Sequence, residues 1–451
     1  MLKIGLLCPG RTRFVSFPTE NIGRAEVLMN GPMKQRRLVH RILKGFALLV
    51  MFGVLAIAAL LLSLWVEHRT EVTLPTPTGP FAVGRAIYDW ADDGTPDTLA
   101  PVPGTKRELL VWIWYPAAGP PGAAVDDYLP AQVRAPARPV VSPLMFRLLS
   151  RVFGLLTRDI SRVHTHSTRN SDVSAQQRSY PVVIMRAGAS LEVWNYSTLA
   201  EDLASHGYVV VGFDAPYRTG TVVFPDGRVM RRIPENDPEL CLEQTGKERD
   251  RCADRLLTAW TADSAFVLDR LEQLNASDAS VKFKGRLDMM RVGVFGHSFG
   301  GAAAALFCQE DSRCKAGVDV DGAPHGSVIQ AGINRPFMFL LSGHGHESDP
   351  EVTQIWSDIQ SIYDRLPADG RALIEIRGAN HFLFSDDGAL LKSHIVMRTL
   401  RLLGIVGIDG RRQLAVTAYC LHTFFDSYLM GTSVSKLRIS SPLYPEIHVL
   451  Q

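Results

Sequence analysis

The sequence lacks three features that would place it in common functional classes. Its 48 Lys and Arg are nearly matched by 46 Asp and Glu, so the 451 residues carry a net charge of only +2. Nucleic-acid-binding proteins usually show a strong basic excess, and we therefore exclude that class. No segment of roughly 20 to 50 residues recurs, which excludes a solenoid or a propeller. The six cysteines match no zinc-binding spacing.

One segment of the chain lacks charge altogether. Residues 45–66 form an unbroken apolar run, and a helix of that length, at about 1.5 Å per residue, crosses a hydrocarbon core of roughly 30 Å. Basic residues precede the run and acidic residues follow it; they are Lys34, Arg36, Arg37, His40, Arg41 and Lys44 before it, and Glu67 with residues 89–97 after it. The positive-inside bias predicts that residues 1–44 lie in the cytoplasm and that the rest is exported.

A cleaved signal peptide is the alternative interpretation of this run. Its apolar core is usually about 7 to 15 residues long and ends in small residues. Residues 45–66 are longer and end in Leu64-Trp65-Val66. We therefore expect an uncleaved, single-pass anchor in the inner (cytoplasmic) membrane, with the part of the chain after the anchor on the extracytoplasmic side.

The cysteines fit export. Cys241 with Cys252, and Cys308 with Cys314, could each close a small disulfide loop in an oxidising compartment. Cys420 lies in an apolar helical pattern, which predicts a buried free thiol.

Beyond a linker at residues 67–80, the pattern predicts one α/β domain over residues 81–451. Strand-like runs alternate with helical patterns from residue 180 onward, which implies a mainly parallel sheet with helices on both faces. The strands are expected at 182–185, 209–213, 292–295, 316–320, 337–341 and 372–376, and the helices at 198–205, 255–274, 299–309 and 352–365. An amphipathic pattern at 145–160 predicts a further helix, which either lies on the membrane surface or packs on the domain.

The residues around Ser298 carry the strongest chemical signal. A predicted strand ends just before Gly296-His297-Ser298-Phe299-Gly300, and an Ala-rich helix follows. A G-x-S-x-G sequence between a strand and a helix presents the serine hydroxyl on a sharp turn, and the glycines avoid clashes there. This context predicts an α/β-hydrolase fold with Ser298 as the nucleophile.

A nucleophilic serine needs a base, and this fold takes its histidine from beyond the last strand. His381 follows the strand 372–376 directly and is favoured over its competitors, which are His325, His344, His346 and His394. The spacing of His344 and His346 is also that of a metal pair, but no third ligand of suitable spacing accompanies them, so we predict no metal.

The acid that orients the imidazole has two candidates on spacing alone. Asp321 follows the strand 316–320, and Asp349 follows the strand 337–341. Asp319 lies inside a strand and is interpreted as structural. One oxyanion donor is expected to be the backbone N–H of Phe299, and the other an N–H of the loop 186–190.

Five motifs occur in order along the predicted domain; they are Thr78-Gly79-Pro80-Phe81-Ala82-Val83-Gly84, Val111-Trp112-Ile113-Trp114-Tyr115-Pro116, Leu203-Ala204-Ser205-His206-Gly207-Tyr208, Gly296-His297-Ser298-Phe299-Gly300-Gly301 and Ile376-Arg377-Gly378-Ala379-Asn380-His381. Taken together, these motifs resemble the plasma-type platelet-activating factor acetylhydrolases and their bacterial relatives. The resemblance implies a calcium-independent serine esterase whose acid is Asp321 and whose second oxyanion donor is the N–H of Ala189. The family often has His-Gly before that donor, whereas this chain has Ala187-Gly188.

The expected activity is ester hydrolysis through an acyl-enzyme, without a metal or organic cofactor. The resemblance implies short or oxidised sn-2 acyl groups of phospholipids as substrates. A general carboxylesterase for short soluble esters or polyesters, and an inactive membrane-anchored binding module, are the alternatives. The expected partners are the ester or lipid substrate and, through residues 45–66, the membrane.

Overall fold

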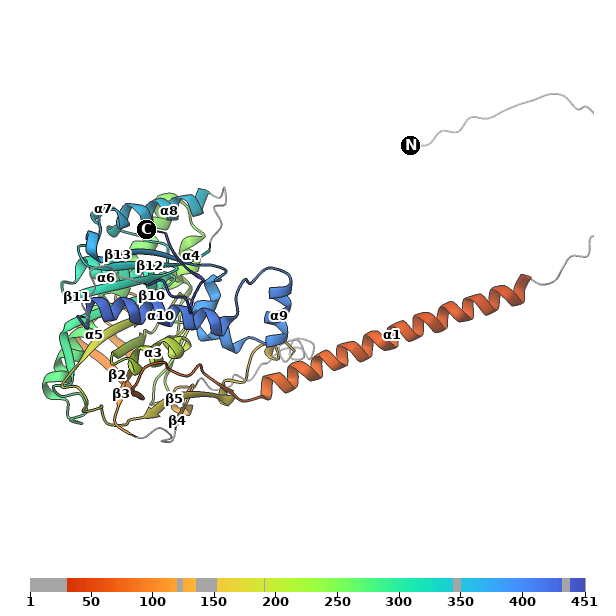
Figure 1. Ribbon diagram of the computed structural model, residues 1–451, viewed down its shortest axis with the longest axis horizontal. Helices are drawn as coiled ribbons and strands as arrows, with labels where there is room; N and C mark the ends of the chain where they lie inside the picture. Colours follow the sequence, from red (N-terminus) through yellow and green to blue (C-terminus); the bar gives the residue numbers. More distant parts are fainter. Residues whose placement is uncertain are drawn as a thin grey trace, which may run out of the picture. The chain divides into compact units, whose positions relative to one another are not determined.

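The computed structural model describes residues 31–119, 125–134, 152–189, 191–343, 350–431 and 439–450. The chain divides into two compact units, Met1–Leu60 and Leu61–Gln451. Helix α1 (Gly31–Arg69) contains the whole apolar run predicted from the sequence (Figure 1). Its segment Arg36–Arg69 contains an 18-residue stretch with a mean hydropathy of 2.8 and is long and apolar enough to cross a membrane, as predicted.

The larger unit is built on a sheet of twelve described strands, ordered β1-β5-β2-β3-β7-β6-β10-β11-β12-β13-β14, with β4 paired to β5. Its centre, from β7 to β13, is parallel throughout. The central strands are β6 (Tyr180–Arg186), β7 (Val209–Asp214), β10 (Leu287–His297), β11 (Cys314–Val320), β12 (Phe337–Ser342) and β13 (Arg371–Ile376). Each of the six predicted strands lies within one of these, which confirms the predicted fold.

The outer strands extend the sheet at both ends. β3 (Lys106–Ala117) runs antiparallel to both β7 and β2 (Ala82–Pro96), and β14 (Ile447–Val449) runs antiparallel to β13. Beyond β2, the sheet continues with β5 (Val163–Arg169), which pairs with both β1 (Val72–Thr73) and β4 (Val125–Asp127). A separate hairpin consists of β8 (Thr221–Val223) and β9 (Val229–Arg231).

Helices cover both faces of the sheet, as Figure 1 shows. On β6, Val182 and Ile184 pack into one core with α5 (Gly246–Ser277), α6 (Phe299–Glu310) and α8 (Pro350–Tyr363). The alternate residues Val183 and Met185 pack into the other, with α3 (Ser197–Ser205) and α10 (Gly410–Tyr428). Side chains alternate between the faces of a strand, so an apolar run without polar interruption is what a strand buried on both sides requires.

Shorter helices connect these layers; they are α4 (Pro238–Leu242), α7 (Val328–Ala331) and α9 (His394–Leu402). Disulfides join Cys241 to Cys252 and Cys308 to Cys314, and Cys420 is a buried free thiol.

The helix predicted over 145–160 lies partly outside the described residues, and its described part ends early. Of the described residues 152–159, only 152–154 are helical. The backbone N–H of Arg158 then bonds to Leu391 O, and that of Asp159 bonds to His68 O. Pairing with distant segments thus replaces the helical hydrogen bonds that the amphipathic pattern favoured.

Candidate active site

Ser298 lies on the sharp turn between β10 and α6. Its backbone φ of 56° is positive, which is rare for a residue with a side chain. The turn is very tight: a Cβ atom on Gly296 would lie 2.0 Å from Gly300 O. The Ser298 N–H donates to Val320 O of β11 at 2.9 Å and fixes the turn to the neighbouring strand. The glycine spacing in the sequence is therefore a steric requirement of this turn.

The loop after β6 lies against the same turn. A Cβ on Gly300 would lie 2.3 Å from Ala187 O, and one on Gly188 would lie 3.4 Å from the Ser298 Cβ. The loop that carries Ala189 therefore borders the serine. Phe299 is the first residue of α6, so its N–H belongs to the first helical turn, where N–H groups have no partner within the helix. The two predicted oxyanion donors thus come from elements that meet at Ser298.

His381 bridges the serine and Asp321. Its Nε2 lies 3.1 Å from Ser298 Oγ, and its Nδ1 lies 2.8 Å from Asp321 Oδ2. The three residues follow β10, β11 and β13, whose carboxyl ends share one edge of the parallel sheet. The Asp321 side chain is fully buried, whereas the His381 ring is 31% exposed. The imidazole is therefore open to a substrate while the acid is shielded from water.

Ser342, at the end of β12, holds the Asp321 carboxylate in place. Its backbone N–H donates to Asp321 Oδ1 at 2.7 Å, and its hydroxyl donates to Oδ2 at 2.8 Å. The rival acid, Asp349, lies outside the described residues, as do His344 and His346.

Asp319 has a different environment from Asp321. Its Oδ1 accepts a hydrogen bond from the Gly322 N–H at 2.8 Å, and burial raises the pKa of its carboxyl to about 8. A carboxyl that is neutral at pH 7 cannot stabilise an imidazolium as an anion does, so this environment fits the structural interpretation of Asp319.

Two residues that the sequence did not single out join the loop after β6 to the serine turn. Tyr196, at the end of a short helical turn (Val193–Tyr196), accepts a hydrogen bond from the Gly188 N–H at 3.1 Å. Its hydroxyl lies 2.7 Å from Nδ1 of His297. Burial lowers the pKa of His297 to about 3, so the ring is neutral and Nδ1 can accept. The chain of contacts from Gly188 through Tyr196 to His297 fixes the loop next to Ser298.

The loop that carries His381 is held by α10. The Gln413 side chain accepts from the Asn380 N–H and donates to Asn380 O, both at 2.9 Å. The Asn380 side chain in turn accepts from the Phe382 N–H. Gln413 is buried and lies 32 positions after His381, so nothing in the local sequence pattern pointed to it.

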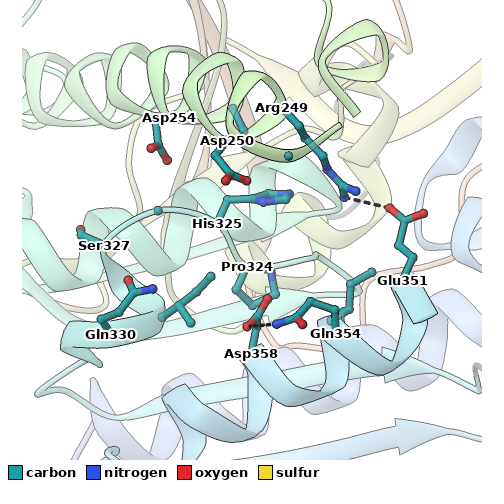
Figure 2. A pocket seen from close by; sticks show the side chains of 15 residues that line it. Arg249, Asp250, Asp254, Pro324, His325, Ser327, Gln330, Glu351, Gln354 and Asp358 are labelled. Atoms are coloured by element: carbon teal, nitrogen blue, oxygen red, sulfur yellow. Dashed lines mark hydrogen bonds and ion pairs between the residues drawn. The ribbon is translucent and has the colours of Figure 1, made fainter. Parts of the chain in front are cut away.

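A large polar cavity lies elsewhere, among the start of α5, residues 324–330 and α8 (Figure 2). Its volume is about 620 Å³, and Ser298, Asp321 and His381 are not among its lining residues. His325, one of the competing histidines, lines this cavity, and burial lowers its pKa to about 4. Among the described histidines, the geometry therefore brings His381 and not His325 to the serine.

We compared the chain with known protein families, curated proteins and solved structures. The model of the family "Platelet-activating factor acetylhydrolase, isoform II" matches residues 66–222 and 260–429. A protein of Arthroderma benhamiae named "Probable 1-alkyl-2-acetylglycerophosphocholine esterase" is 26% identical over 83% of this chain and 92% of its own length. The platelet-activating factor acetylhydrolase of Canis lupus familiaris is 26% identical over 54% of each chain.

Among solved structures, a ferulic acid esterase from Streptomyces cinnamoneus has the same fold. Its TM-score is 0.62 at 24% identity, over 85% of this chain and all of that one. The likeness concerns the fold alone. The family model, by contrast, covers both the serine turn and the His381 loop: the chain belongs to the platelet-activating factor acetylhydrolase family, isoform II, and is an ester hydrolase.

Proposed function

We propose that Ser298, His381 and Asp321 form the catalytic triad of a membrane-anchored phospholipid esterase that removes short or oxidised sn-2 acyl groups. The observation that carries the triad is the continuous contact from Asp321 through His381 to Ser298 Oγ, at 2.8 and 3.1 Å. A neutral imidazole with its Nδ1–H on the carboxylate presents the Nε2 lone pair to the serine hydroxyl.

Acyl transfer then proceeds in two steps. His381 Nε2 takes the hydroxyl proton as Ser298 Oγ attacks the ester carbonyl, and the same proton passes to the leaving alcohol. Water, deprotonated by His381, attacks the acyl-enzyme and releases the acid, and the proton returns to Ser298. The backbone N–H groups of Ala189 and Phe299 donate to the oxyanion in both steps.

The phospholipid part of the proposal rests on two observations. The matched relatives carry the names of enzymes that act on 1-alkyl-2-acetylglycerophosphocholine or platelet-activating factor. The same chain has a helix long and apolar enough to cross a membrane, and an anchored domain meets its lipid substrate at high local concentration.

The test compares full-length wild type with Ser298→Ala in detergent micelles. The substrates are phospholipids with short, oxidised or long sn-2 chains, beside nitrophenyl esters of rising chain length. We expect wild type to cleave the short and oxidised sn-2 chains and Ser298→Ala to cleave none. Equal hydrolysis by both proteins would refute the triad. Cleavage of nitrophenyl esters alone would favour a general carboxylesterase, and failure of a fluorophosphonate to label Ser298 would favour an inactive binding module.

We also propose that the anchor leaves the catalytic domain outside the cytoplasm at the inner membrane. The basic residues before the apolar run support this orientation, as do the two disulfides, which persist in oxidising compartments. Protease added to spheroplasts should degrade the domain, while a cytoplasmic marker protein survives. Degradation of the domain only after lysis would indicate the opposite orientation.

A further inference from the structure

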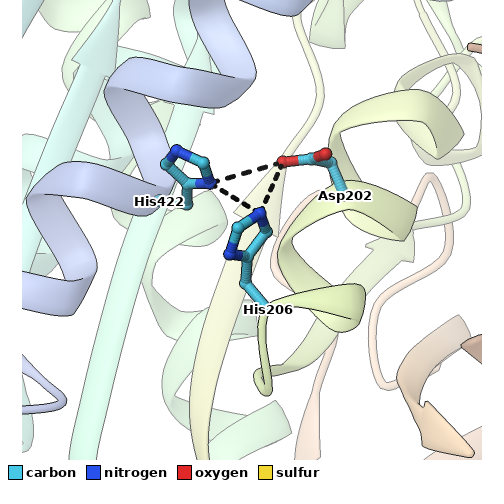
Figure 3. Close-up of side chains that lie close together, drawn as sticks. All are labelled: Asp202, His206 and His422. Carbon is cyan, nitrogen blue, oxygen red and sulfur yellow. Dashed lines mark hydrogen bonds and ion pairs between the residues drawn. The ribbon is translucent and has the colours of Figure 1, made fainter. Parts of the chain in front are cut away.

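A second cluster of reactive side chains lies between α3 and α10, away from the serine. Asp202 and His206 stand four residues apart at the end of α3, and His422 faces them from α10 (Figure 3). Residues four apart on a helix share one face. One ligand atom from each of the three residues lies within 4.8 Å of the others.

The three ligand atoms are spaced as the corners of a metal site. His206 Nε2 and His422 Nδ1 are 2.8 Å apart, and Asp202 Oδ2 lies 3.9 Å from the first and 3.7 Å from the second. Ligands bound to Zn²⁺ at about 2.0 to 2.1 Å in a tetrahedron are roughly 3.3 Å from one another. The observed distances bracket that value, and shifts of a few tenths of an ångström would equalise them.

Asp202 Oδ2 gives an independent reason to expect a cation. Asp202 is 4% exposed, and its Oδ2 is buried without a hydrogen-bond partner among the described residues. The other oxygen, Oδ1, accepts from the Thr78 N–H at 2.9 Å and the Thr78 hydroxyl at 2.8 Å. A buried carboxylate oxygen without a donor is costly. Thr78 therefore orients the carboxylate so that its unsatisfied oxygen points at the two histidines.

Two histidine nitrogens face each other in this cluster. His422 Nδ1 and His206 Nε2 are at hydrogen-bond distance, so one of the two nitrogens carries the shared proton, and His206 Nε2 also lies 2.8 Å from the Thr78 hydroxyl oxygen. When both become ligands, that proton is released to solvent.

A cavity of about 270 Å³ opens beside the cluster, lined among others by Thr198, Leu414, Tyr419 and Tyr444. It gives an ion and a water molecule access to a fourth position. We propose that Asp202, His206 and His422 bind a divalent transition-metal ion, with Zn²⁺ the best match to two imidazoles and one carboxylate.

The metal would join three parts of the chain that meet here. α3 supplies Asp202 and His206, α10 supplies His422, and the segment before β2 supplies Thr78 as the partner of the carboxylate. The same α10 carries Gln413, which holds Asn380 next to His381. Bound metal therefore stabilises the packing of α10, and the ligand set itself is separate from Ser298, Asp321 and His381.

The experiment titrates Co²⁺ and Zn²⁺ into the full-length protein, without a polyhistidine tag, in detergent and after removal of metals by a chelator. We expect one Co²⁺ per chain with the visible absorption of tetrahedral coordination, its displacement by Zn²⁺, release of a proton on binding, and a Zn²⁺-dependent rise in the melting temperature. Absence of a saturable Co²⁺ band in wild type would overturn the proposal without reference to any variant.

Two substitutions keep the shape of the site while removing a ligand. His206→Gln and His422→Asn each leave a polar atom near the position of the lost nitrogen, and each should weaken Co²⁺ binding by at least about 100-fold. His448→Asn is the matched control, since His448 Nδ1 lies 3.8 Å from a carboxylate, that of Glu375. Retained ester hydrolysis reports that each variant is folded. Unchanged Co²⁺ binding in the folded His206 and His422 variants would overturn the assignment.

Discussion

The Tyr196 hydroxyl lies 2.7 Å from Nδ1 of His297, the residue directly before the serine. The same hydroxyl accepts the Gly188 N–H from the loop after β6. One buried phenol thus fixes the distance between the turn that carries Ser298 and the loop that carries Ala189. Oxyanion stabilisation depends on that distance, because a donor acts only when it lies about 2.7 to 3.1 Å from the developing charge.

Tyr196→Phe should therefore slow catalysis without unfolding the domain. The substitution leaves His297 Nδ1 without its donor and Gly188 without its acceptor. We expect kcat to fall by about tenfold and the free energy of unfolding to fall by about 1 to 3 kcal/mol. Steady-state kinetics on a soluble nitrophenyl ester measure the first quantity.

Tyr180→Phe is the control for this substitution. Tyr180, the first residue of β6, is also fully buried, and its hydroxyl donates to Ser174 O. It should lose similar stability with little change in kcat. Equal losses of kcat in both variants would mean that Tyr196 supports the fold in general and not the oxyanion loop.

Asp321→Asn should lower kcat by roughly 10³- to 10⁴-fold, the loss known when the acid of a serine triad is replaced by its amide. The amide favours the wrong tautomer of His381 and removes the charge that stabilises the imidazolium. Ser342→Ala removes the hydrogen bond from the Ser342 hydroxyl to Asp321 and keeps the one from the Ser342 backbone N–H, so it should lower kcat only about tenfold. Steady-state kinetics that determine kcat and KM separately would measure both effects.

Asp349→Asn decides between the two acids that spacing left open. We expect it to keep most of the wild-type activity. Large loss at Asp349 with little loss at Asp321 would reverse the assignment.

The central part of the fold could be predicted from the sequence because the patterns that specify it are local. The apolar runs that became β6, β7 and β10 to β13 are buried on both faces, and such strands carry no competing helical pattern. The G-x-S-x-G turn is equally local, since Gly296 and Gly300 are required by contacts within five residues or with the adjoining loop.

The supporting residues could not be read in the same way. Gln413 reaches Asn380 across 33 positions, and Tyr196 reaches His297 across 101. Neither has a motif of its own, and a buried polar residue looks in sequence like an exposed one. The choice of Asp321 over Asp349 also needed more than spacing, because both follow neighbouring strands. The helix predicted at 145–160 ends earlier than expected in its described part, because long-range backbone pairing replaces the local pattern at Arg158 and Asp159.

Gly300→Ala should prevent folding of the active-site edge. A Cβ at this position would lie 2.3 Å from Ala187 O and 2.7 Å from Arg186 O, and these backbone atoms at the end of the central strand β6 cannot move aside. We expect little folded protein and no activity. Gly154→Ala is the control, since no atom of the described part of the chain lies within 4 Å of a Cβ there, and its yield and melting temperature should match wild type. A well-folded, active Gly300→Ala would contradict the tight packing of this turn.

Asp319 predicts how stability depends on pH. Burial raises the pKa of its carboxyl from 3.8 to about 8, so the folded chain holds a proton that the unfolded chain releases near pH 4. The stabilisation is fully present below about pH 4 and is lost as pH rises through about 8, with a slope of at most about 1.4 kcal/mol per pH unit. Asp319→Asn keeps an oxygen for the Gly322 N–H and removes the titration. Its melting temperature relative to wild type should therefore rise from about pH 5 to about pH 8 and level off above that pH. Parallel curves for the two proteins over that range would mean that Asp319 is ionised in the folded chain, and would contradict the argument that its carboxyl is neutral at pH 7.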